Sequence, residues 1–343
     1  MTATPPRRRL LWSAAATIAS LATLVATAPA SAQLAVEGQG TTVTETAGNG
    51  NGVVEPGDAF AIHETLGSAE FDTLTGVTGT LSTSSPGVTL SQASSAYPNL
   101  DFGTPADNLT AFEGKLADSA ECGARLAFDL AVSTDQGPVD VPFSVPTGAP
   151  GTVSSSDSGA IVAIPDGGTA TSSIVVNDPG RVKGVRVRIG QLTHTYDGDL
   201  GIALVAPDGT AVTLVNRRGG SGDDFAGTVF DQSATQSVRT ASAPFTGAFR
   251  PEGDLGVLDG VQQQGTWSLR VTDNSFGDTG FIQSWGVDVA PAVCVPQPPP
   301  PPPDDPRLPP GFTRRSERAQ GQWPDPPGFD RNNPRAHAAR PSQ

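Results

Sequence analysis

The sequence is poor in the residues on which most catalytic and metal centres depend. Its 343 residues include only three histidines, two cysteines and one methionine, and aromatic side chains make up 6% of the chain. It has no Cys/His cluster with zinc-ligand spacing and no glycine-rich phosphate loop opening a helix. Beyond the apolar run near the N-terminus, no segment approaches the length needed to span a bilayer. The formal net charge of -14 argues against nucleic acid as a partner, and it suits either calcium binding or simple solubility.

Glycine and proline are abundant instead. The chain has 40 Gly and 32 Pro, which favours short strands joined by many turns over helices. Apolar and polar residues alternate over 126–132 and over 139–145, and Gln136-Gly137-Pro138 separates the two runs, which predicts an antiparallel hairpin. Pro142 cannot donate a ladder hydrogen bond and therefore predicts an edge strand. We expect residues 33–147 to form an immunoglobulin-like β-sandwich.

Residues 1–32 have the pattern of a secretory signal peptide. Arg7-Arg8-Arg9 form a charged region, Leu10 to Val25 form an apolar core, and Ala30-Ser31-Ala32 form a small-residue cleavage site. We therefore expect a secreted protein whose mature chain starts near Gln33, with the periplasm or the cell surface as alternative destinations. The arginines fit both a general-secretion signal and a twin-arginine signal.

Cys122 and Cys294 are the only cysteines. In an exported protein they either form a disulfide or remain as two separate thiols. A bridge between them would close a loop of about 170 residues and would cost the unfolded chain about 4–5 kcal/mol on the entropy model. It would tie the first domain to the end of the second.

A cluster of motifs organises the second half of the chain. It begins with His194-Thr195-Tyr196-Asp197-Gly198-Asp199, continues with an alternating strand over 200–204, and turns at Pro207-Asp208-Gly209. Two further alternating runs carry Trp267 and Trp285. Buried tryptophans on paired strands are typical of a β-sandwich or jelly roll.

The order and spacing of these motifs resemble the P domain, or Homo B domain, of kexin- and furin-like proprotein convertases. The resemblance covers about 161–291 and includes Ile164-Pro165-Asp166 and the strand Val182 to Ile189. The fold-signature positions are His194, Asp197, Asp199, Trp267, Asp273 and Trp285. The resemblance implies a jelly roll of eight or nine strands over 161–292. In the family, this domain is a non-catalytic module that stabilises an adjacent subtilisin-like protease. The whole chain is therefore expected to be all-β, with two β-sandwich domains.

One candidate calcium site lies in the first domain. Asn49, Asn51, Gly52 and Asp58 fall at positions three, five, six and twelve of an EF-hand loop, although Ala47 occupies the first position, where a carboxylate is expected. The same stretch resembles the lead-in of bacterial extracellular immunoglobulin-like repeats. Turn formation alone is the alternative explanation of its Asn and Gly residues.

A second candidate calcium site lies in the P-like domain. Its loops carry the carboxylates Asp199, Asp273 and Asp278, and the hypothesis is one structural calcium held by some of them. Several P domains are thought to be supported by calcium, so the resemblance favours this hypothesis, but it does not identify the ligands. Aspartates in loops are otherwise common as solvated turn formers, which is the alternative interpretation.

The remaining segments are polar. Residues 148–160 are rich in Gly, Ser and Pro and are predicted to be a linker. Residues 293–343 contain a proline tract at Gln297 to Pro303 followed by an arginine-rich stretch. This tail buries too little apolar surface to fold, so we expect it to be disordered. It serves either as a spacer or as a contact with an anionic polymer of the cell envelope.

No catalytic set is predicted. His337 lies in the tail, His63 lies on a predicted strand, and His194 belongs to the P-domain pattern; no Gly-x-Ser-x-Gly motif or subtilisin-like motif accompanies them. The favoured hypothesis is a secreted non-catalytic protein that binds or stabilises a partner, such as a separately encoded subtilisin-like protease. A serine-type endopeptidase by family association and a cell-envelope adhesion protein are the two alternatives.

Overall fold

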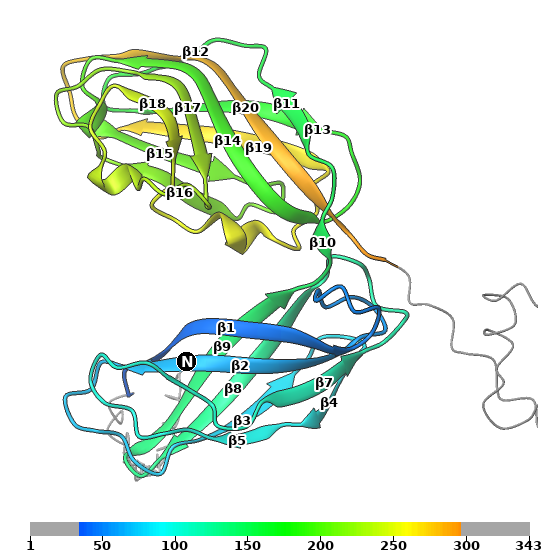
Figure 1. Ribbon diagram of the computed structural model, residues 1–343. Coiled ribbons are helices and arrows are strands. Elements are labelled where there is room, and N and C mark those ends of the chain that lie inside the picture. The colour runs from blue at the N-terminus through cyan, green and yellow to red at the C-terminus, as the bar shows by residue number, and fades with distance from the viewer. Residues whose placement is uncertain (1–33, 296–343) are drawn as a thin grey trace, which may run out of the picture.

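The protein is built from two β-sandwich domains that follow each other along the chain (Figure 1). The computed structural model describes residues 34–295. The predicted signal peptide at 1–32 lies outside these residues, as does nearly all of the tail predicted for 293–343. No helix between residues 34 and 295 is long and apolar enough to cross a membrane. The all-β class predicted from the sequence is confirmed.

The first domain packs a five-stranded sheet against a four-stranded sheet. One sheet has the order β1-β2-β7-β4, with β6 also paired to β2, and the other has the order β5-β3-β8-β9. The strand bounds are β1 Val36–Ala47, β2 Ala59–Ser68, β3 Thr78–Thr83, β4 Val88–Gln92, β5 Ser94–Ala96, β6 Ala106–Asp107, β7 Phe112–Leu116, β8 Arg125–Thr134 and β9 Gly137–Pro146.

The predicted hairpin of the first domain is confirmed. β8 and β9 pair antiparallel from Arg125↔Pro146 to Thr134↔Gly137. β9 lies at the sheet edge, where a proline such as Pro142 is tolerated although it has no amide hydrogen. Alternate residues of β8 and β9 point into the core between the two sheets. In that core the ring of Phe128 packs edge-to-face against the ring of Phe60. Period-2 hydrophobicity therefore defines the core of this domain.

The second domain also has two sheets. The larger has the order β10-β20-β14-β17-β18, with β11 and β12 also paired to β20, and the smaller has the order β13-β19-β15-β16. Their bounds are β10 Ala149–Pro150, β11 Ser154–Asp157, β12 Val162–Ile164, β13 Thr169–Val176, β14 Val182–His194, β15 Leu200–Val205, β16 Ala211–Asn216, β17 Phe225–Asp231, β18 Phe245–Phe249, β19 Gly265–Asp273 and β20 Gly280–Val293. Three short 3₁₀ turns complete the domain: η1 Asp197–Asp199, η2 Val238–Thr240 and η3 Leu255–Leu258.

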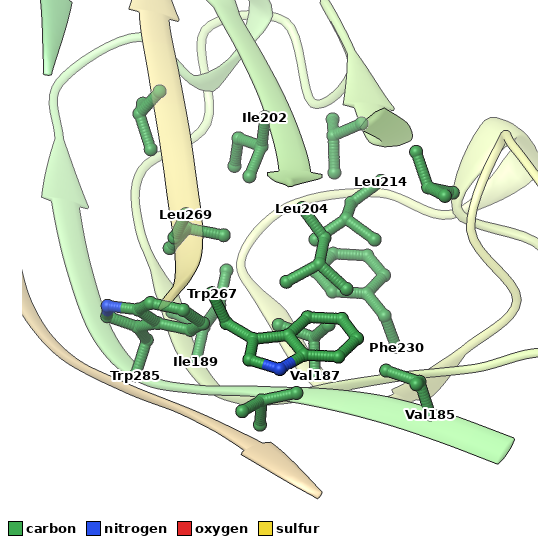
Figure 2. Packing of buried hydrophobic residues seen from close by; sticks show 14 of the residues in the cluster. Val185, Val187, Ile189, Ile202, Leu204, Leu214, Phe230, Trp267, Leu269 and Trp285 are labelled. Carbon is green, nitrogen blue, oxygen red and sulfur yellow. The ribbon is translucent and has the colours of Figure 1, made fainter. Parts of the chain in front are cut away.

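The two tryptophans lie on facing sheets and not on paired strands, which corrects the sequence prediction. Trp267 is on β19 in the smaller sheet, whereas Trp285 is on β20 in the larger sheet, and both are buried in one core (Figure 2). Around them pack aliphatic side chains from both sheets, including Val187, Ile202 and Leu269. Each sheet thus contributes a tryptophan to the layer between them, and the larger sheet adds phenylalanines from β17 and β18, among them Phe230.

The segment predicted as a linker belongs to the second domain. β10 and β11 lie within 148–160, and both pair antiparallel with β20. β11 consists of Ser154, Ser155, Ser156 and Asp157, and its sequence therefore has no alternation of apolar and polar residues. Backbone hydrogen bonds to β20 form the pairing. Without β10, β11 and β12, each sheet of the second domain has four strands, as the expected eight-stranded jelly roll requires.

A disulfide and several hydrogen bonds join the two domains. Cys122, before β8, is bonded to Cys294, after β20, with their Cα atoms 5.9 Å apart. Arg125 on β8 donates hydrogen bonds to the carbonyl oxygens of Gly256 (2.7 Å) and Asp259 (2.8 Å) at η3. Gly260 has a φ of 86°, and a Cβ there would lie 2.8 Å from the Arg125 Cβ, so this close contact requires glycine.

Candidate functional site

The His194 region lies where β14 ends and the chain turns into η1. Leu192 pairs with Ile282 and His194 pairs with Gly280 on β20. A Cβ at Gly280 would lie 2.1 Å from the Thr193 carbonyl oxygen and 2.9 Å from the His194 ring, so the absence of a side chain there lets the imidazole lie against β20. The local pairing therefore fixes the position of the His194 ring.

His194, Asp273 and Asp278 form the one group in residues 34–295 whose side-chain donors are arranged as metal ligands, with one donor atom of each within 4.8 Å of the others. The His194 Nε2 atom lies 3.6 Å from Asp273 Oδ2 and 3.9 Å from Asp278 Oδ1. The side chains of His194 and Asp273 are fully buried, and that of Asp278 is 19% exposed. Three elements thus meet here: the end of β14, the end of β19 and the loop before β20.

The surrounding hydrogen bonds orient the two carboxylates. Asp273 accepts a backbone hydrogen bond from Gly167 on Oδ2 (3.2 Å) and one from Ser275 on Oδ1 (3.1 Å). Asp278 accepts the Thr195 hydroxyl on Oδ2 (2.9 Å), which leaves its Oδ1 directed to the imidazole. Both acids are therefore held in place by neighbours other than His194.

A second acidic group surrounds Asp197. Its side chain is buried, its Oδ1 accepts the Asp224 amide hydrogen (3.2 Å), and its Oδ2 has no hydrogen-bond partner. Burial, together with the negative charges of Asp224 and Asp223, raises the pKa of Asp197 to about 7. Asp224 in turn accepts the His194 amide hydrogen on Oδ1 (3.0 Å), so the two acidic groups share the His194 segment.

The predicted P-domain calcium set is brought together only in part. Asp273 and Asp278 meet, but the third member of the group in the structure is His194 and not Asp199. The Asp199 backbone carbonyl oxygen accepts two hydrogen bonds from Asn274, from its amide nitrogen and from its side chain, both 2.9 Å long. An imidazole nitrogen is a poor ligand for calcium, which takes oxygen, so this donor set does not fit that ion.

The loop of the first domain is organised by Glu55, which sequence analysis missed. The Asn49 and Asn51 side-chain amides donate to Glu55 Oε2 at 2.6 and 3.0 Å, and the Val295 amide donates to its Oε1 at 3.2 Å. Asp58 Oδ2 accepts the Glu55 amide hydrogen at 2.8 Å. The loop therefore connects the first domain to the chain that leaves β20, and calcium binding by Asn49, Asn51 and Asp58 stays a prediction.

The two histidines of residues 34–295 contact backbone. His63 Nδ1 lies 3.3 Å from the Asn108 carbonyl oxygen, and His194 Nδ1 lies 3.0 Å from the Tyr196 carbonyl oxygen. Within this described part of the chain, neither imidazole is hydrogen-bonded to a serine hydroxyl. The Ser–His pair on which a serine-protease triad depends is not formed by these two rings.

Comparison with known proteins identifies the second domain. Residues 182–289 match the family model of the proprotein convertase P-domain. This part of the chain is therefore a P domain, as the motifs from His194 to Trp285 predicted. The matched residues run from the first residue of β14 into β20 and include the His194 cluster.

The relatives of this region are long proteins named for peptidase or inactivating activities. Leupeptin-inactivating enzyme 1 of Streptomyces exfoliatus is 37% identical over 116 residues, which is 34% of this chain and 20% of that protein. Transglutaminase-activating metalloprotease of Streptomyces mobaraensis is 37% identical over 125 residues, which is 36% of this chain and 13% of that protein. The chain therefore spans a fifth or less of these relatives.

A solved structure is similar over part of the chain. A serine protease of Aeromonas sobria aligns with 51% of this chain and 38% of its own, at 18% sequence identity and with a TM-score of 0.27. A similarity at this level carries no functional conclusion.

Proposed function

We propose that the chain is a secreted, non-catalytic P-domain protein that binds or stabilises a protein partner, and that this partner is a subtilisin-like protease. The observation that carries the proposal is a P domain joined to a second β-sandwich by a disulfide and by direct hydrogen bonds. The disulfide and the hydrogen bonds restrict the movement of one domain against the other, and such restriction lowers the conformational entropy that is lost on binding a partner.

The sizes of the relatives support a modular role. The regions that match this chain make up 20% and 13% of the two Streptomyces relatives, so most of each relative lies outside the shared module. The names of those proteins describe enzymes, and we infer that the shared domain supports catalysis carried out by another part of the molecule or by a partner. This chain would bring the same support to a protease.

Exposed apolar side chains on the P domain offer a contact surface. Phe281 on β20 is 46% exposed and pairs with Ala163 on β12, and Ile161, just before β12, is 69% exposed. Exposed large apolar residues that lie together are typical of protein-interaction sites. We propose that this Phe281 surface contacts the partner.

Capture from the native culture medium tests the proposal. The tagged chain, incubated with medium and cross-linked, is expected to recover a second protein that a fluorophosphonate serine probe labels. Phe281→Ser is expected to reduce the recovered partner at least tenfold. Leu109→Ser is the control, because Leu109 is a 66% exposed apolar residue of the first domain, and it should leave recovery unchanged.

The same labelling experiment distinguishes the non-catalytic proposal from the alternative that this chain is itself an endopeptidase. If the probe labels this chain at a defined serine, and if His194→Ala abolishes both the labelling and casein digestion, the non-catalytic proposal is wrong. Recovery of no labelled partner, with Phe281→Ser behaving as the parent chain, would also contradict it.

A further inference from the structure

We propose that His194, Asp273 and Asp278 bind one divalent transition-metal ion of the zinc class. The three side chains come from β14, β19 and the loop before β20, so the ion would join the two sheets of the P domain at one end. This proposal is independent of the partner proposed above.

The hydrogen bonding of His194 sets the state of its ring. Nδ1 lies 3.0 Å from the Tyr196 carbonyl oxygen, and a carbonyl oxygen can only accept, so Nδ1 carries a hydrogen. The Tyr196 amide nitrogen is farther from Nδ1, at 3.3 Å. In the neutral ring Nε2 is then an unprotonated lone pair, the form in which metal-bound histidines are held by a backbone carbonyl.

This Nε2 atom is buried and has no hydrogen-bond partner. Its lone pair faces Asp273 Oδ2 and Asp278 Oδ1, and three electron-rich atoms directed at one point in a buried site repel one another. A bound cation converts that repulsion into attraction. Hydrogen bonds with Tyr196, Gly167, Ser275 and Thr195 hold the three donor side chains in their orientations, as the ligands of a metal ion require.

The spacing and chemistry of the donors select the class of ion. Ligands about 2.1 Å from a tetrahedral ion lie about 3.4 Å apart, which is close to the 3.6 and 3.9 Å separations of Nε2 from the two carboxylate oxygens. Calcium requires six or more oxygen ligands, whereas one imidazole and two carboxylates suit zinc and its neighbours in the first transition row.

The site is open on one side only. Asp278 is 19% exposed, whereas His194 and Asp273 are fully buried, so an ion would enter past Asp278 and retain water as its fourth ligand. By tying β14 to β19 and to the start of β20, it would stabilise the end of the sandwich. Its role would be structural and would require no reaction at the metal.

Metal titration tests the proposal on the purified full chain after dialysis against EDTA. We expect one Zn²⁺ to bind per chain by calorimetry and the melting temperature to rise by about 5 °C or more at a 100-fold excess over Kd. Cobalt(II) added in place of zinc should give the visible absorption of a four-coordinate site. Calcium at the same concentration should not compete for this site, so the zinc affinity should stay unchanged.

Two variants and one control locate the site. Asp278→Asn keeps an oxygen for the Thr195 hydroxyl, and His194→Asn keeps a polar atom near Tyr196 but removes Nε2; each should weaken zinc binding about 100-fold or more. Asp199→Asn, which alters the third member of the predicted calcium set, should bind zinc as the parent chain does. Zinc binding that survives Asp278→Asn, absence of stoichiometric binding, or displacement of the bound zinc by calcium would overturn the proposal.

Discussion

At the scale of single residues, the indole N–H groups of two buried tryptophans require hydrogen-bond acceptors inside the P-domain core. The Trp285 indole on β20 donates to the Ser172 hydroxyl on β13 at 2.9 Å, across the two sheets, and Trp267 donates to the Gln263 carbonyl oxygen at 2.9 Å. Both pairs are buried, so each hydrogen bond satisfies a donor that water cannot reach. The alternation around each tryptophan predicted its burial, but no pattern in the sequence identified Ser172 on the opposite sheet as the partner of Trp285.

Trp285→Phe should destabilise the chain by about 2–4 kcal/mol, because it removes buried ring volume and leaves the Ser172 hydroxyl without its donor. Ser172→Ala alone should cost about 1–2 kcal/mol. Urea unfolding of both variants and of the double variant should give a coupling energy of about 0.5–1.5 kcal/mol. Strict additivity of the two losses would show that the hydrogen bond contributes nothing.

Glu64 predicts a pH dependence of stability. It is buried on β2, its carboxylate accepts the Thr41 hydroxyl, and burial raises its pKa to about 7. The unfolded chain releases this proton near pH 4.5 and the folded chain near pH 7, so Glu64 favours folding below pH 4.5 and loses that contribution as pH rises through 7. Asp197, whose pKa is also raised to about 7, acts with the same sign.

Glu64→Gln should therefore flatten the fall in stability between pH 4.5 and 8 and make the variant more stable than the parent at pH 8, by about 1–3 kcal/mol. Chemical unfolding at several pH values measures the difference between the two chains. The exposed residue Glu37 on β1 provides the control, and Glu37→Gln should leave the profile unchanged. A parallel fall in parent and Glu64→Gln chains would exclude Glu64 as its source.

At the scale of elements, alternation predicted the hairpins well. β8–β9 and β15–β16 pair as expected, the second around the Pro207-Asp208-Gly209 turn. The serine-rich strand β11 was missed because its residues carry no apolar face, and its pairing depends on the neighbouring β20. The same limit applies to the His194 cluster, since His194 is far from Asp273 and Asp278 in the sequence and meets them only through strand pairing. A lone histidine in a motif does not reveal which carboxylates the fold will place beside it.

The contact between β8 and η3 gives a prediction at this scale. Arg125→Met keeps much of the side-chain volume but removes both hydrogen bonds to the Gly256 and Asp259 carbonyl oxygens. Amide hydrogen exchange over 255–261 should become about tenfold faster or more, because η3 loses the contacts that hold it against the first domain. Exchange over β15 and β16 serves as the internal reference and should not change.

At the scale of the whole molecule, composition and the alternation of apolar residues predicted two β-sandwiches, but they did not predict the contacts between the two domains. The number of cysteines was compatible with a disulfide and with two free thiols. In the structure, Cys122 and Cys294 form a disulfide across a separation of 172 residues. The Glu121–Arg181 ion pair (2.6 Å) and the bond from Lys183 to the Pro146 carbonyl oxygen (3.0 Å) lie at the same junction. Such contacts depend on how two finished domains meet, which local patterns do not encode.

Replacing both cysteines by serine should lower the free energy of unfolding by about 4–5 kcal/mol if chain entropy dominates. Because the two sandwiches have separate hydrophobic cores, we expect the chain without the disulfide to unfold in two transitions, one for each sandwich. Calorimetry of the Cys122→Ser/Cys294→Ser chain measures this. One undivided transition with an unchanged midpoint would show that hydrogen bonds alone couple the domains.

The covalent loop closed by Cys122 and Cys294 also determines what survives backbone cleavage. The loop contains strands β8 and β9 of the first domain, the connecting segment and the P domain. A single peptide bond hydrolysed at any point between the two cysteines leaves both pieces attached to each other through sulfur. A nicked molecule would migrate as one species without reductant and as two fragments with it. In a medium rich in peptidases, one cut inside this loop therefore does not release either domain.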